Sequence, residues 1–201
     1  MNFRIRAAGE ILNQLTIANV LDIGCRGCEA KQILREGIEY YGNDLFQNEY
    51  GEVIYVGDVL QVDFGRTFDC VVALDIVEHV DDPYVLMDKI ISLSNKYVIV
   101  SLPNTYDLPH KIDFLLKSSL GKKYSFETSN RLDRHRWVMN YDEIYAFYSY
   151  YAIKYGISLN TTNIRLGESS SNTRSKLAST LLRPIVGKKN LTRTVIGVFT
   201  K

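Results

Sequence analysis

Acidic side chains stand where predicted strands end, and their spacing indicates a nucleoside-binding site. Asp22 lies in the run VLDIGC (residues 20–25), which closes on a glycine turn that lets the backbone approach a ligand. Asp44 lies about 20 residues further on, at the end of a second apolar run. A carboxylate there can accept both ribose hydroxyl groups. Asp58 follows a third run and could accept the exocyclic amine of adenine.

The spacing of the glycines separates two kinds of nucleoside cofactor. A nicotinamide enzyme also carries an acidic residue at this distance from its glycine loop. Here, however, the spacing is Gly24-x-x-Gly27 rather than G-x-G-x-x-G, and Asp22 would face an anionic pyrophosphate. A cofactor without phosphate, carrying cationic sulfonium and ammonium groups, suits this loop better. A nicotinamide oxidoreductase remains the alternative.

Strands and helices that alternate along the chain would position these acids. Apolar runs predict strands at residues 19–24, 39–44, 52–56, 68–74, 96–102, 157–166 and 192–200. Helices are expected at residues 3–17, 28–36, from 83 onward, 111–120, 141–155 and 177–182. This order predicts an α/β, doubly wound, mostly parallel sheet with its ligand beyond the carboxyl ends of the strands. We expect a single domain over residues 1–201, with an insert or cap region at about 104–138.

At these motifs the sequence resembles the class I S-adenosylmethionine-dependent methyltransferases, in the small-molecule branch called types 11, 12 and 23. The VLDIGC run looks like their first motif, Asp44 matches their ribose acid, and Gly57-Asp58 matches their adenine motif. Residues 68–83 and 97–104 resemble their fourth-strand and fifth-strand motifs. The resemblance implies a Rossmann-like seven-stranded sheet with an antiparallel last strand at residues 192–200. It also implies S-adenosyl-L-methionine as the cofactor.

The same resemblance implies which residues bind the cofactor. They are Asp22, Gly24, Cys25, Arg26, Asp44, Leu45, Asp58, Val59 and Leu74. The family pattern continues D-x-G-C-G-x-G, but Arg26 and Cys28 stand at the later glycine positions of this chain. Arg26 could itself contact the cofactor carboxylate.

The expected reaction is methyl transfer to an O- or N-nucleophile of a small or medium-sized acceptor. Such catalysis is mostly proximity and orientation, with a base where the acceptor must lose a proton. The candidate bases are His79, just after the fourth strand, and His110 and His135 in the insert that would shape the acceptor pocket. The alternative for each histidine is a hydrogen-bonded structural role.

Two further features of the sequence bear on function. Cys25 and Cys28 form a C-x-x-C pair, but no second cysteine pair completes a zinc site, so we predict no metal. Residues 100–104 also resemble the MetW proteins of methionine biosynthesis. A non-catalytic, cofactor-binding partner subunit of that kind is therefore the alternative to an enzyme.

Composition sets the remaining expectations. A net charge of +1 argues against a nucleic-acid partner, although eight basic residues and one acidic residue lie between Arg165 and Lys201. This basic C-terminal region could meet an anionic substrate or a membrane surface. We predict a cytoplasmic protein from three observations. The chain has an odd number of cysteines, three, it shows no signal-peptide pattern, and it contains no apolar run long enough to span a bilayer. The sequence leaves the oligomeric state open.

Overall fold

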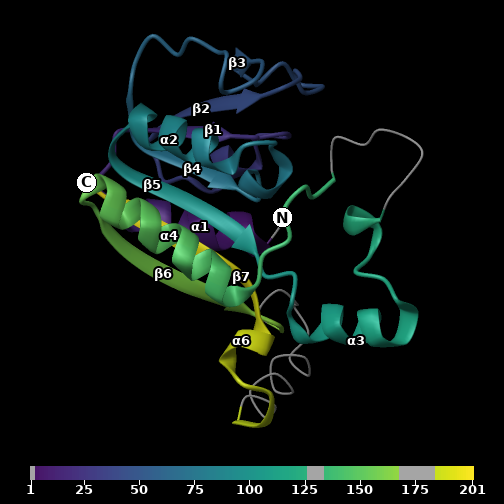
Figure 1. Cartoon of the computed structure of the whole chain (residues 1–201). Coiled ribbons are helices and arrows are strands. Elements are labelled where there is room, and N and C mark those ends of the chain that lie inside the picture. Colours follow the sequence, from purple (N-terminus) through teal and green to yellow (C-terminus); the bar gives the residue numbers. More distant parts are fainter. Residues whose placement is uncertain (1–2, 126–133, 168–183) are drawn as a thin grey trace.

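The computed structural model of the chain describes residues 3–125, 134–167 and 184–201, and it contains the predicted α/β sheet. Seven strands lie in the order β3-β2-β1-β4-β5-β7-β6, and β7 runs antiparallel to both of its neighbours (Figure 1). Their bounds are β1 Asn19–Ile23, β2 Glu39–Asp44, β3 Tyr55–Val56, β4 Phe68–Leu74, β5 Ser94–Pro103, β6 Ser158–Arg165 and β7 Thr192–Thr200. The predicted mostly parallel sheet with an antiparallel last strand is confirmed.

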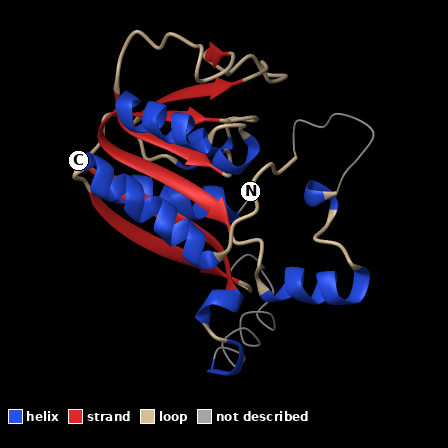
Figure 2. Ribbon diagram, in the orientation of Figure 1, coloured by secondary structure: helices blue, strands red, loops and turns tan. Residues whose placement is uncertain are grey.

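Helices cover both faces of the sheet (Figure 2). Helices α2 (Pro83–Leu93) and α4 (Tyr141–Tyr155) pack on one face, and α1 (Phe3–Gln14) packs on the other. Strand β4 serves both layers because its side chains alternate: Val71 and Ala73 join the cluster under α2 and α4, whereas Val72 joins the cluster under α1.

Side-chain caps fix the starts of the two helices on the first face. Asp82 caps α2 by accepting hydrogen bonds from the backbone of the first turn, with Pro83 at its first position. Asn140 and Glu143 form a reciprocal capping box at the start of α4. Both starts agree with the sequence prediction.

The parallel and antiparallel parts of the sheet meet beneath one tyrosine. Tyr148 of α4 is fully buried, and its hydroxyl donates to the carbonyl oxygens of Val100 in β5 and Val195 in β7, at 3.0 and 3.1 Å. Gly197 makes room for the ring, since a methyl group there would lie only 2.9 Å from it. The packing of α4 therefore depends on a glycine in β7.

Several predicted elements are shorter in the structure, among them the helix predicted at residues 3–17, which ends at Gln14. The predicted helix at residues 28–36 is wrong, because only the 3₁₀ turn η1 (Glu29–Ile33) forms. The left-handed backbone at Cys28, with φ of 53°, excludes residue 28 from a right-handed helix, and η1 begins directly after it. Strand β3 was predicted from residue 52 but begins at Tyr55. The side chains of Gln47 and Asn48 form hydrogen bonds with the backbone groups of residues 52 and 53, which are therefore not paired in the sheet.

The remaining elements lie beyond the carboxyl ends of the strands. They are η2 (Val77–His79), α3 (Leu108–Lys117), η3 (Lys122–Tyr124) and α6 (Lys188–Leu191). Helix α3 extends away from the sheet on this side (Figure 1). The helix predicted at residues 177–182 falls outside the described residues, as does the part of the basic C-terminal region at residues 168–183. Within the described residues, no helix is long and apolar enough to cross a membrane.

Candidate functional site

A cavity of about 170 Å³ lies at the carboxyl ends of β1 and β4. Five of the nine residues predicted to bind the cofactor line this cavity: Asp22, Gly24, Cys25, Arg26 and Leu74. The parallel strands bring these residues together because their carboxyl ends share one edge of the sheet. The predicted base His79 also lines the cavity.

Asp22 is a buried acid of the cavity. The Tyr40 hydroxyl on β2 donates to its Oδ2 atom at 2.7 Å. Burial, together with the negative charge of Asp44, raises the pKa of Asp22 to about 7, although the hydrogen bond from Tyr40 opposes this shift. The Asp22 carboxyl group thus changes charge near neutral pH.

The loop after β1 keeps a tight turn despite its substituted glycines. Gly24 has φ +71°, and a methyl group on it would overlap the side chain of Ile76. Arg26 and Cys28 both adopt the left-handed backbone that glycine favours. The Asp44 carboxylate holds this loop, because its Oδ2 accepts a 2.9 Å hydrogen bond from the Arg26 N–H group.

The four other predicted cofactor residues lie outside the lining of the cavity. Asp44 ends β2, and Leu45 after it is half exposed. Asp58 is exposed and accepts the N–H group of Leu60 within its own turn. Val59 is buried in the core beside β4.

The cysteine pair packs beneath the loop. The Sγ atoms of Cys25 and Cys28 are 3.5 Å apart, and both residues are buried as free thiols over Gly42. Burial, and then the charge of Asp22, raises the pKa of Cys25 well above its ordinary value. A neutral, buried thiol does not suit nucleophilic redox chemistry.

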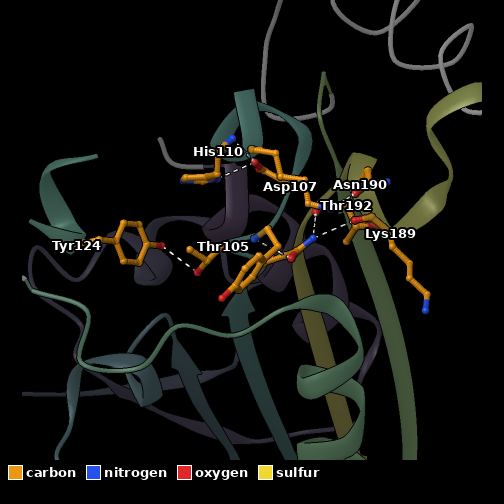
Figure 3. Close-up of polar contacts among 10 residues, drawn as sticks. Thr105, Asp107, His110, Tyr124, Lys189, Asn190 and Thr192 are labelled. Atoms are coloured by element: carbon orange, nitrogen blue, oxygen red, sulfur yellow. Dashed lines mark hydrogen bonds and ion pairs between the residues drawn. The ribbon is translucent and has the colours of Figure 1, made fainter. Parts of the chain in front are cut away.

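The three predicted bases belong to one row of aromatic rings. His79 contacts His135 edge to face with their centroids 4.6 Å apart, His135 contacts Tyr124 at 4.9 Å, and Tyr124 contacts His110 at 6.0 Å. Asp107 holds His110 through a 2.6 Å contact with Nδ1, and Thr105 holds the Tyr124 hydroxyl (Figure 3). Only His79 of the three histidines reaches the cavity wall.

The sequence prediction missed several residues of the cavity. Asp75 directly follows β4 and could have been found by the same rule that found Asp44. It is buried with φ +55°, it accepts a 2.6 Å hydrogen bond from Ser101, and it pairs with Arg4. Arg4 and Lys123 also line the cavity, but they come from distant parts of the chain that no local pattern connects to it.

The charges of the cavity fit the amino-acid end of S-adenosylmethionine. This part of the cofactor carries an ammonium and a carboxylate group. The same space is surrounded by two acidic side chains, Asp22 and Asp75, and by three positively charged ones, Arg4, Arg26 and Lys123. Both signs of charge are therefore available. The carboxylate of Asp44, tied to the loop, is of the type that accepts ribose hydroxyl groups.

Comparisons with known proteins show the family of the chain. A family model described as a methyltransferase domain matches residues 3–154. No curated protein sequence matches the chain. The resemblance to MetW proteins is supported by none of these results.

Solved structures share the fold at low sequence identity. The methyltransferase domain of a bacterial CtHen1 has a TM-score of 0.64 at 17% identity, covering 99% of this chain and 98% of that one. A plantazolicin methyltransferase, BamL, has a TM-score of 0.62 at 14% identity, covering 99% and 85%. Magnesium protoporphyrin IX methyltransferase from Synechocystis PCC 6803, with bound SAH, has a TM-score of 0.60 at 14% identity, covering 98% and 81%.

The fold, the charged cavity at the ends of β1 and β4, and the family match over residues 3–154 also exclude the nicotinamide alternative. The chain therefore belongs to the methyltransferase domain family and is an S-adenosylmethionine-dependent methyltransferase.

Proposed function

We propose that the chain methylates an oxygen or nitrogen nucleophile of a small or medium-sized acceptor at the cavity beyond the carboxyl ends of β1 and β4. The observation that carries this proposal is that Asp22 and Arg26 line one cavity. When bound, the cofactor supplies a methyl group that its sulfonium already activates. The protein then has to hold both reactants in line and exclude water.

Each part of the cofactor has a proposed partner in this chain. Asp22 would accept the ammonium group, and Arg26 would pair with the carboxylate. Asp44 and Leu45 would hold the ribose, and Asp58 and Val59 would hold the adenine. Gly24, Cys25 and Leu74 would contribute backbone and surface at the centre of the site.

The histidines would accept the proton that the acceptor loses on methylation. An oxygen or nitrogen nucleophile that loses a proton on methylation needs a group to receive it. His79 lies at the cavity wall, and His135 and His110 follow it along the row of rings. The segment between β5 and α4, which carries two of the three histidines, would shape the acceptor pocket.

The relatives act on chemically diverse acceptors. One of them is named for magnesium protoporphyrin IX, and BamL was crystallised with a triazolic desmethylPZN analog and SAH. Because the fold does not select the acceptor, we base the proposal of a small or medium-sized acceptor, rather than a nucleic acid, on the near-neutral charge of the chain.

Calorimetric titration with the demethylated cofactor tests the proposal. We expect micromolar binding to the full chain and at least about tenfold weaker binding to Asp22→Asn and to Arg26→Ala, since each removes a charge-assisted contact. The matched control is Asp113→Asn, which removes a carboxylate paired with Lys117 on α3. Absence of binding by both S-adenosylmethionine and its demethylated product would refute the proposal.

A further inference from the structure

Three side chains of the metal-binding type converge beside the cofactor cavity. Glu78 and His79 lie in η2, and His135 comes from the segment before α4. One ligand atom of each lies within 4.8 Å of the others. The Oε1 atom of Glu78 is 3.9 Å from Nε2 of His79 and 3.9 Å from Nε2 of His135. A single carboxylate oxygen therefore faces two imidazole nitrogens.

The cluster is removed from solvent. Glu78 is 0% exposed and His135 is 8% exposed, while the side chain of His79 is 14% exposed. A buried carboxylate is costly unless a positive charge compensates it. A metal ion between the three groups would supply such a charge.

The hydrogen bonding of His79 favours the metal ion. Its Nδ1 atom lies 3.0 Å from the carbonyl oxygen of Arg134, and a carbonyl can only accept. Nδ1 therefore carries a proton and donates to this carbonyl, which leaves Nε2, 3.9 Å from Oε1 of Glu78, as the ring atom that would bind a metal ion. An imidazole bound to a metal is typically oriented in this way, with its other nitrogen donating to a carbonyl.

The backbone also holds His135 in place. The carbonyl oxygen of Glu78 accepts hydrogen bonds from the N–H groups of Arg136, at 2.8 Å, and Trp137, at 3.3 Å. The two segments that supply the cluster are thus joined next to their ligand-type side chains. Such support is what a preorganised site requires.

We propose that Glu78, His79 and His135 bind a divalent first-row transition-metal ion at the wall of the cofactor cavity. Two imidazoles and one carboxylate suit such ions better than Mg²⁺ or Ca²⁺, which prefer oxygen ligands. Three protein ligands leave coordination positions open to a substrate. His79 and His135 then act as ligands rather than as bases.

This inference rests on the proposed function and makes the acceptor more specific. A cation beside the cavity lowers the pKa of a hydroxyl group that approaches it, so no histidine has to remove the proton. An acceptor with one hydroxyl group, or with two adjacent ones, can use the open positions. We therefore assign the acceptor to hydroxylated compounds and the reaction to O-methylation.

Metal binding by the full chain tests the inference directly. The chain is stripped with a chelator and titrated with Mn²⁺, followed by the paramagnetic resonance signal of the free ion, and with Co²⁺, followed by its visible absorption. We expect one ion per chain and Co²⁺ bands typical of imidazole ligands. Glu78→Gln and His135→Asn should each weaken binding at least about tenfold. His110→Asn, a histidine outside the cluster, should leave the metal affinity unchanged.

The same preparations separate this inference from the proposed function. If the unmodified chain binds none of Mn²⁺, Co²⁺ and Zn²⁺ at millimolar concentration but still binds the demethylated cofactor, the metal site is overturned and the methyltransferase proposal stands. If the chain binds a metal ion but not the demethylated cofactor, the methyltransferase proposal is overturned and the metal site stands. His79→Gln provides a further ligand variant if Glu78→Gln does not fold.

Discussion

The hydroxyl group of Tyr40 on β2 donates a 2.7 Å hydrogen bond to the Asp22 carboxylate on the adjacent strand β1. This bond gives a largely buried carboxylate a hydrogen-bond partner. It does not fully offset burial, because the pKa of Asp22 still rises to about 7. Asp22 is therefore a cofactor-binding candidate that changes charge at physiological pH.

Cofactor binding should depend on pH through Asp22. Below pH 7 the carboxyl group is mostly protonated and attracts an ammonium group only weakly, so affinity should rise between pH 6 and pH 8. For a single group that ionises near pH 7, the total gain over these two pH units is about tenfold. Calorimetry with the demethylated cofactor at three pH values measures it. Asp22→Asn should bind weakly at every pH, and a pH-independent affinity of the unmodified chain would contradict this role.

The same residue should lower the stability of the fold at alkaline pH. The pKa of Asp22 is about 7 in the folded chain, against a reference value of 3.8, so the folded state keeps a proton that the unfolded state has lost. Stability from this group is therefore present at low pH and declines as the pH rises from about 4 to 7.

Asp22→Asn should remove that decline, since an amide oxygen can still accept from Tyr40. We expect the variant to gain up to ~4 kcal/mol over the unmodified chain at pH 8 and little at pH 4. Urea denaturation at both pH values measures the difference. Asp63→Asn, an exposed turn residue, should change stability equally at both.

Gly24→Ala should damage the loop after β1 in two separable ways. A side chain at φ +71° costs about 1 kcal/mol, and the added methyl group also overlaps Ile76. We expect a total loss of about 2–4 kcal/mol in the free energy of unfolding, together with loss of cofactor binding.

A matched glycine isolates the steric part of this effect. Gly51 has φ +70°, but nothing lies within 4 Å of its hypothetical methyl group, so Gly51→Ala should show the backbone cost alone. Adding Ile76→Ala to Gly24→Ala should recover part of the steric loss. Equal losses at Gly24 and Gly51 would show that the contact with Ile76 does not matter.

Arg26→Gly should separate stability from binding. Arg26 is exposed and held at φ 47°, so glycine should stabilise the fold by about 0.5–1 kcal/mol. Loss of the guanidinium group should nevertheless weaken cofactor binding about tenfold. Thermal unfolding and calorimetry on one preparation give both values, and unchanged affinity would remove Arg26 from the proposed site.

The strands were the most predictable part of this chain. The starts and ends of β2, β4 and β7 match the sequence prediction, because apolar runs bounded by turn residues leave little freedom for a buried strand. The capping residues fixed the start of α4 in the same way. Left-handed Arg26 and Cys28 were not predictable, because neither residue type favours that backbone.

The candidate site could be predicted only in its local part. Asp22 and Asp44 follow from their places at strand ends, since the carboxyl ends of parallel strands share an edge. The row of rings that joins His79 to His110 depends on where the segment after β5 folds back, and so does the cluster with Glu78. The spacing of residues in the sequence does not predict where this segment folds back.

The tyrosine beneath α4 also has a consequence for how the protein unfolds. Tyr148 binds carbonyl groups on both β5 and β7, so the antiparallel pair β6–β7 cannot separate from the parallel strands without exposing a buried hydroxyl. This pair and the parallel strands should therefore open as one cooperative unit. Their slowest amide protons should exchange with solvent at similar rates.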